Sequence, residues 1–86
     1  MENIVRQIVL EELEKLPPGT RVRTIEFVDS VIARLKENVE LTEEQEADIR
    51  PLVVDVLWEL HKQGIIRFDD TLIRFEKPQK RSSKTS

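Results

Sequence analysis

Residues 53–66 read VVDVLWELHKQGII, and this stretch decides the fold of the chain. The apolar residues just before it and within it recur every three or four positions, as on one face of a helix: Ile49, Val53, Val56, Leu57 and Leu60. Gly64 favours a helix end, because glycine adopts the left-handed backbone that closes a helix. We therefore predict a helix over residues 51–63 that ends at a glycine.

The sequence after this helix predicts a β-hairpin. Residues 65–68 and 71–75 are rich in β-branched and aromatic side chains, and an acidic dipeptide at 69–70 separates them. A two-residue loop would pair Gly64 with Phe75. One face of that hairpin would hold Ile66, Phe68 and Ile73, and the other Arg67 and Arg74. Tight loops favour glycine, which is missing here, so a longer loop is the alternative.

Two further amphipathic helices are expected upstream. Residues 2–16 and 25–37 both carry apolar side chains at helical spacing. The Pro-Pro-Gly sequence at 17–19 should end the first helix, and the hydroxyl of Thr24 should cap the second. Glu12 falls on the apolar face of the first helix, where we expect it to pair with an arginine; a buried functional carboxylate is the alternative.

The segments between the helices carry their own signals. Residues 21–23 alternate between arginine and valine, which predicts a very short strand. Thr42 and Gln45 have the spacing of a capping box, so a helical turn should begin at residue 43. Pro51 follows, and because proline removes a helical hydrogen bond, we expect either a break or a kink near residues 49–51.

Composition bounds the class of protein. Of 86 residues, 38% are hydrophobic and 36% are charged, which is typical of one soluble domain and excludes a disordered chain. No stretch is apolar enough for a membrane span, and the start of the chain does not resemble a secretory signal, so we expect a cytoplasmic protein. The chain has no cysteine, which excludes disulfides, thiolate metal sites and thiol nucleophiles. We expect no metal, no cofactor and no enzymatic activity.

The expected fold class is mainly α with a C-terminal β-hairpin. We predict one domain over residues 1–76 and a disordered basic tail over residues 77–86, because the tail has no large apolar residue to bury. The order of elements resembles a winged-helix domain, a form of helix-turn-helix. The resemblance rests on residues 53–66 and the hairpin that follows them to Phe75, since in that family a recognition helix runs into a glycine and then into the wing.

The resemblance implies duplex DNA as the partner and transcription regulation as the role. In winged-helix proteins the third helix enters the major groove and the wing contacts the phosphate backbone. The residues that would contact DNA here are Arg21, Arg23, Arg50, Lys62, Arg67, Arg74, Lys77, Lys80 and Arg81. Two features depart from the family. Asp55 on the outward face of the third helix and Glu59 on its flank would repel phosphates, and the net charge is −3, whereas DNA-binding domains are usually basic.

The alternative is a winged-helix protein-interaction or dimerisation module that does not bind nucleic acid. Trp58 falls on the side of the third helix opposite its apolar face, with Val54 and His61 on the flanks, and aromatic residues concentrate binding energy at interfaces. The acidic residues of this helix favour the alternative. A helical wheel does not decide whether Trp58 is exposed or is covered by residues 37–48 or by the first helix.

Overall fold

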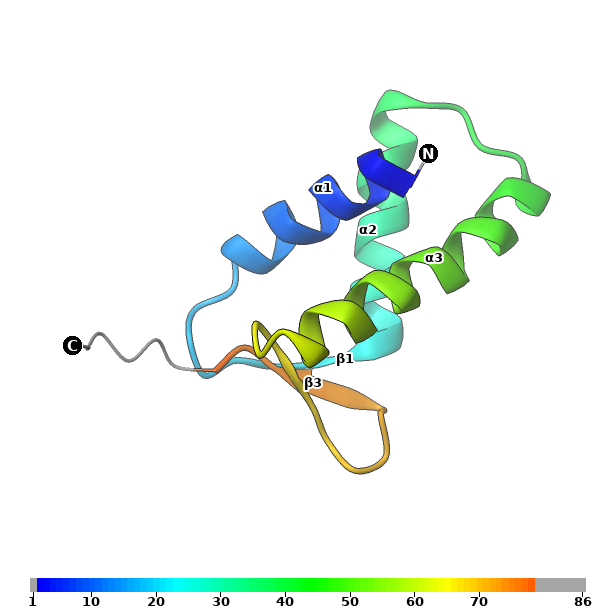
Figure 1. Ribbon diagram of the computed structural model, residues 1–86. Coiled ribbons are helices and arrows are strands. Elements are labelled where there is room, and N and C mark those ends of the chain that lie inside the picture. Colours follow the sequence, from blue (N-terminus) through cyan, green and yellow to red (C-terminus); the bar gives the residue numbers. More distant parts are fainter. Residues whose placement is uncertain (1, 79–86) are drawn as a thin grey trace.

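The computed structural model describes residues 2–78, which form three helices and a small antiparallel sheet (Figure 1). The helices are α1 (Glu2–Glu14), α2 (Thr24–Asn38) and α3 (Glu43–Lys62). The strands are β1 (Arg21–Arg23), β2 (Arg67–Phe68) and β3 (Arg74–Glu76). These elements confirm the expected fold class, a mainly helical, winged-helix-like domain with a C-terminal hairpin.

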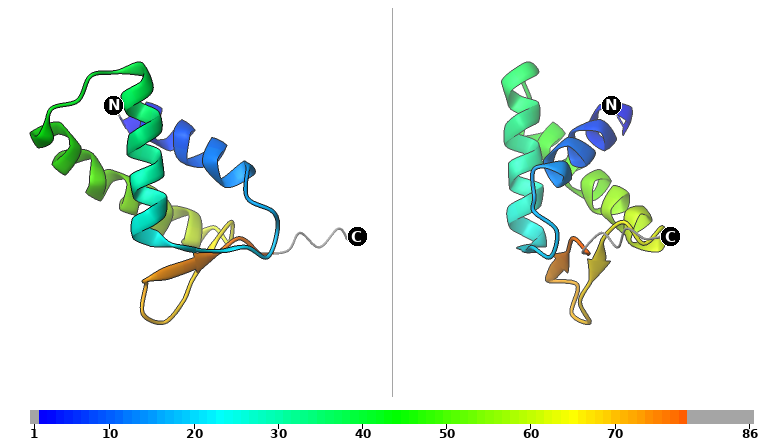
Figure 2. Two further views of the ribbon diagram at one scale, coloured as in Figure 1. Left: turned by 180° about the vertical axis from the view of Figure 1, so that it is seen from behind. Right: turned by 90° about the vertical axis from the view of Figure 1, so that its left-hand side faces the viewer.

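The three helices pack around one apolar core. Both α1 and α3 lie on the same side of α2, and the sheet lies at the end of the helices where α2 begins (Figure 2). The apolar residues at helical spacing in α2, Phe27, Val28, Val31, Ile32 and Leu35, are buried, as are those predicted in α3, whereas Ile4 of α1 is 47% exposed. The rings of Phe27 and Phe75 meet edge to face at 5.2 Å, which joins α2 to the sheet.

The predicted strand at residues 21–23 forms and joins the hairpin. The strand order is β1-β3-β2, and both pairings are antiparallel. Phe68 pairs with Phe75 across β2 and β3, and both side chains are buried against the helices. Since successive strand residues alternate between faces, the other face of the sheet points to solvent.

The hairpin has the longer loop rather than the two-residue turn. Because Phe68 pairs with Phe75, residues 69–73 connect the strands, and the pairing of Gly64 with Phe75 is wrong. Ile73 is consequently 58% exposed instead of lying on the buried face of the hairpin. Leu72 adopts a left-handed conformation with φ 63°, which costs about 1 kcal/mol for a residue with a side chain.

Helix α3 is one continuous helix rather than a turn followed by a second helix. It begins at the predicted capping box, in which Thr42 and Gln45 exchange hydrogen bonds of 3.1 and 2.9 Å. Pro51 lies inside the helix without ending it, so the break is wrong. Ile49 and Val53 on either side of Pro51 are buried, and this packing offsets the lost hydrogen bond.

The end of α3 agrees with the predicted glycine cap. Gly64 has φ 82°, and the N–H groups of Gly64 and Ile65 donate to the carbonyl oxygens of His61 and Leu60 at 3.0 and 2.9 Å. This pair of hydrogen bonds is a Schellman motif, which turns the chain from α3 towards β2.

The side chain of Arg34 joins α2 to α1. Glu12 pairs with Arg34 of α2 at 2.6 Å, as expected, and Arg34 also contacts Glu11 at 2.7 Å. The hydrogen bond to Glu11 is the main cause that raises the pKa of Arg34, with burial acting against it.

The expected cap by Thr24 is wrong: Arg23 is the N-cap of α2, without a side-chain hydrogen bond, and the Thr24 hydroxyl donates to the hairpin loop.

Candidate functional site

The solvent face of the sheet brings together four of the predicted DNA contacts. We call this group the arginine face: Arg21, Arg23, Arg67 and Arg74. Arg23 lies directly opposite Arg74, while Arg21 and Arg67 are paired with Glu76 from its two sides. All four side chains are exposed.

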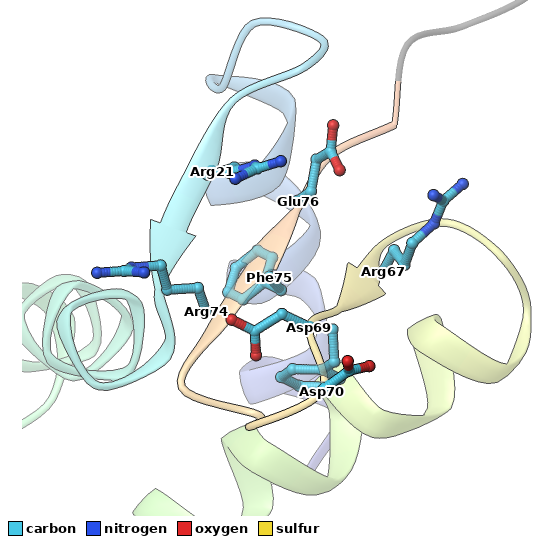
Figure 3. A pocket seen from close by; sticks show the side chains of 8 residues that line it. Arg21, Arg67, Asp69, Asp70, Arg74, Phe75 and Glu76 are labelled. Atoms are coloured by element: carbon cyan, nitrogen blue, oxygen red, sulfur yellow. The ribbon is translucent and has the colours of Figure 1, made fainter.

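The arginine face is not a continuous positive patch. A pocket of about 290 Å³ on this face is lined by three of the arginines together with Asp69, Asp70 and Glu76 (Figure 3). The guanidinium groups of Arg67 and Arg74 point in opposite directions in this view. Arg23 lies 4.0 Å from Glu26, whereas Arg21, Arg67 and Arg74 form no ion pair within residues 2–78. The carboxylates therefore offset much of the positive charge.

Lys77 is engaged at the end of α1. Its ammonium group donates to the carbonyl oxygens of Leu13 and Leu16 at 2.9 and 2.8 Å, where α1 ends. Its backbone N–H donates to the Thr20 carbonyl at 2.9 Å. Lys77 therefore caps the end of α1 and extends the pairing of β1 with β3, whereas the sequence predicted a DNA contact for it.

Two of the remaining predicted DNA contacts, Arg50 and Lys62, lie on α3. Arg50 pairs with Asp29 of α2 at 2.5 Å. Lys62 is exposed in the last turn of α3. Lys80 and Arg81 lie outside the described residues, as does most of the predicted tail, so their roles stay predictions.

Acidic residues outnumber basic ones along α3. The first turn carries Glu43, Glu44 and Glu46, of which Glu46 pairs with Lys36 of α2. Asp55 is exposed near the middle of the helix, and Glu59 pairs with Arg6 of α1 at 2.6 Å. The side that a DNA-binding winged helix presents to the major groove therefore has more acid than base, and it would repel phosphates.

A second surface lies where α3 meets the start of α2 and the hairpin loop. We call it the apolar surface, and its members are Ile25, Pro51, Val54, Trp58, Leu72 and Ile73. All of these except Trp58 line one groove of about 420 Å³. Ile25 and Leu72 are 63% and 51% exposed, so the groove is open to solvent along much of its length.

Hydrogen bonds between elements hold this groove in shape. The Thr24 hydroxyl donates to the Leu72 carbonyl at 3.1 Å, and the Thr24 N–H donates to the Ile73 carbonyl at 2.8 Å. On the other side, the ion pair between Arg50 and Asp29 joins α3 to α2. The apolar surface is therefore assembled without a partner.

Trp58 is half-exposed, at 41%. Its covered side lies against His61, with ring centroids 5.1 Å apart, and against Phe68, 5.7 Å apart. His61 itself accepts the Phe68 N–H through Nδ1 at 3.2 Å. His61 therefore anchors β2 to α3, whereas Val54 and Trp58 keep the free apolar area expected of partner-binding residues.

Sequence reasoning did not find Ile25, Leu72 and Ile73 as site residues. Ile25 directly follows the residue that was expected to cap α2, and the two-residue turn placed Ile73 on the buried face of the hairpin. The available signal was the pair of large aliphatic residues at 72–73 in a loop that also contains two aspartates.

No protein-family model, curated protein or solved structure matches this chain. None of the helices within residues 2–78 combines the length and apolarity needed to cross a membrane. Across the same residues, no group of three or more His, Cys, Asp and Glu side chains is placed to hold a metal ion.

Proposed function

We propose that this winged-helix-like domain is a protein-interaction module that docks through its apolar surface. The observation that carries the proposal is the groove of about 420 Å³ lined by exposed apolar side chains from α2, α3 and the hairpin loop. Contiguous apolar patches on the surface of a folded domain commonly mark binding sites, whereas single exposed apolar residues are normal.

Burial of this surface is a source of binding energy. Removing apolar area from water contributes about 25 cal/mol per Å², so each half-exposed aliphatic side chain adds about 1 kcal/mol when covered. Trp58 adds a large aromatic group of the kind that dominates interface energetics. Because Thr24 and Arg50 already hold the groove, little ordering entropy is lost on binding.

The charge of α3 supports a protein partner over DNA. Glutamates fill its first turn, and its arginine and lysine are Arg50, which is paired, and Lys62. A protein partner that places apolar or cationic side chains against the exposed residues of this helix avoids the repulsion that phosphates would meet.

A second candidate function is weak binding of duplex DNA, with a role in transcription regulation. The observation that favours it is the arginine face, where Arg21, Arg67 and Arg74 form no ion pair within the described residues. Such binding would be electrostatic, indifferent to base sequence and sensitive to salt.

Site-specific photo-crosslinking in the cells that naturally contain the protein tests the leading proposal. A photoreactive residue at position 72 should give a discrete protein adduct, and the Ile25→Ser/Ile73→Ser variant should lose it. The Arg21→Gln/Arg67→Gln/Arg74→Gln variant, which leaves the groove intact, should keep it. A photoreactive residue at Glu37, exposed on α2, is the positional control. Absence of any adduct specific to position 72 would contradict the proposal.

A further inference from the structure

One exposed stripe runs along the whole of α3. Six positions spaced by three or four residues share one side of the helix, and all are exposed: Glu44, Ala47, Pro51, Val54, Trp58 and Lys62. The stripe is acidic at its first residue, apolar through its middle and basic at its last residue. Its ends are about 27 Å apart at 1.5 Å per residue.

Because of this order of charges, two copies of α3 complement each other when they run in opposite directions. Residue 53 is midway between Glu44 and Lys62, so a two-fold axis at the level of residue 53 would place each glutamate opposite the lysine of the other copy. Val54 of both copies would meet close to the axis. Trp58 would lie over Ala47 of the other copy, where the small side chain leaves room for an indole.

We infer that the partner of the apolar surface is a second copy of this chain, packed with the two α3 helices antiparallel. This inference rests on the proposed function and names the partner that binds the apolar surface. Antiparallel packing also opposes the two helix dipoles, whereas parallel packing would place Glu44 against Glu44 and align the dipoles.

Neighbouring groups fit the same arrangement. Pro51 and Val54 belong to both the stripe and the groove, so covering the stripe also covers the edge of the groove. Asp55 lies beside the stripe and lines the same surface pocket as Arg6, whose guanidinium group pairs with Glu59 at 2.6 Å. Residues 79–86 contain no apolar side chain, so they offer nothing to fill the groove in place of a second copy.

Sedimentation equilibrium on the full chain at concentrations up to about 1 mM tests the inference. The wild type should form dimers. Lys62→Glu replaces two attractive contacts with two repulsive ones and should weaken dimerisation by about 3- to 30-fold. Glu44→Lys should do the same, and the double variant should restore most of the wild-type affinity. Glu37→Lys makes the same charge change outside the stripe and should have no effect.

The outcomes separate this inference from the proposed function. A strictly monomeric wild type, or a charge-swapped double variant that is no tighter than either single variant, would overturn the second copy as partner. If photo-crosslinking at position 72 then still captures a different protein, the proposed function stands without the dimer. Dimerisation that is insensitive to Val54→Asp would also overturn the inference, because Val54 lies nearest the axis.

Discussion

The hydroxyl of Thr24 donates a hydrogen bond to the carbonyl oxygen of Leu72 at 3.1 Å, across 48 positions of sequence. This contact ties the first turn of α2 to the hairpin loop. Leu72 has a left-handed conformation, and both residues line the groove. A residue that the sequence marked as a helix cap thus helps to build the apolar surface.

Loss of this hydroxyl should loosen the loop. Thr24→Val keeps the shape of the side chain and should reduce the free energy of unfolding by about 1 kcal/mol. Hydrogen exchange should accelerate most at residues 71–74. Thr24→Ser keeps the hydroxyl and serves as the control. Unchanged exchange in the loop of Thr24→Val would show that the backbone contact to Ile73 alone holds it.

Trp58 should contribute to stability as a half-covered residue. Trp58→Ala removes the stacking on His61 and uncovers Phe68, and it should cost about 1–2 kcal/mol, below the roughly 3–5 kcal/mol typical of a buried aromatic residue. Leu57→Ala, at a fully buried site on the same helix, should cost about 2–5 kcal/mol. Chemical denaturation measures both. A loss above 3 kcal/mol for Trp58→Ala would mean that the ring belongs to the core.

The sequence predicts the helices better than the hairpin, and the reason is physical. Apolar spacing is a local property, and it placed the buried residues of α2 and α3 correctly. The hairpin register depends on distant contacts, namely the pairing of β1 with β3 and the hydrogen bonds of Thr24. Pro51 is similar, since only the burial of its neighbours shows that α3 continues through it.

The candidate sites show the same division. The four residues of the arginine face could be selected because exposed basic residues are visible in the sequence. Their acidic neighbours in the folded sheet could not, because Glu76 comes between Arg21 and Arg67 only through strand order. Nor does the sequence show that the ammonium group of Lys77 donates hydrogen bonds to carbonyl groups some sixty positions away.

The hairpin loop should lose stability in acid. Desolvation acts to raise the pKa of Asp69, but hydrogen bonds from the Thr71 hydroxyl and from backbone N–H groups outweigh it, and the pKa lies below its ordinary value of 3.8. A depressed carboxylate pKa contributes stability that is present above the ordinary value and is lost as pH falls through the folded-state value.

An NMR titration of the side chain of Asp69 and of the Thr71 amide measures this effect. Both signals should titrate together below pH 3.8, and Asp69→Asn should remove the transition. Asp70→Asn, one position along the same loop, is the control and should retain it. Titration of Asp69 above its ordinary value would contradict the hydrogen-bonded arrangement of the loop.

DNA titrations at two salt concentrations should separate the arginine face from α3. Each phosphate contact contributes about −0.9 to the slope of log affinity against log salt, so Arg21→Gln/Arg67→Gln/Arg74→Gln should flatten that slope. Asp55→Asn removes a negative charge from α3 and leaves the Arg6–Glu59 pair intact. It should not change DNA binding if α3 faces a protein. Tighter binding by Asp55→Asn would instead place α3 against the phosphates, and it would favour the winged-helix mode of DNA recognition over the protein-interaction module.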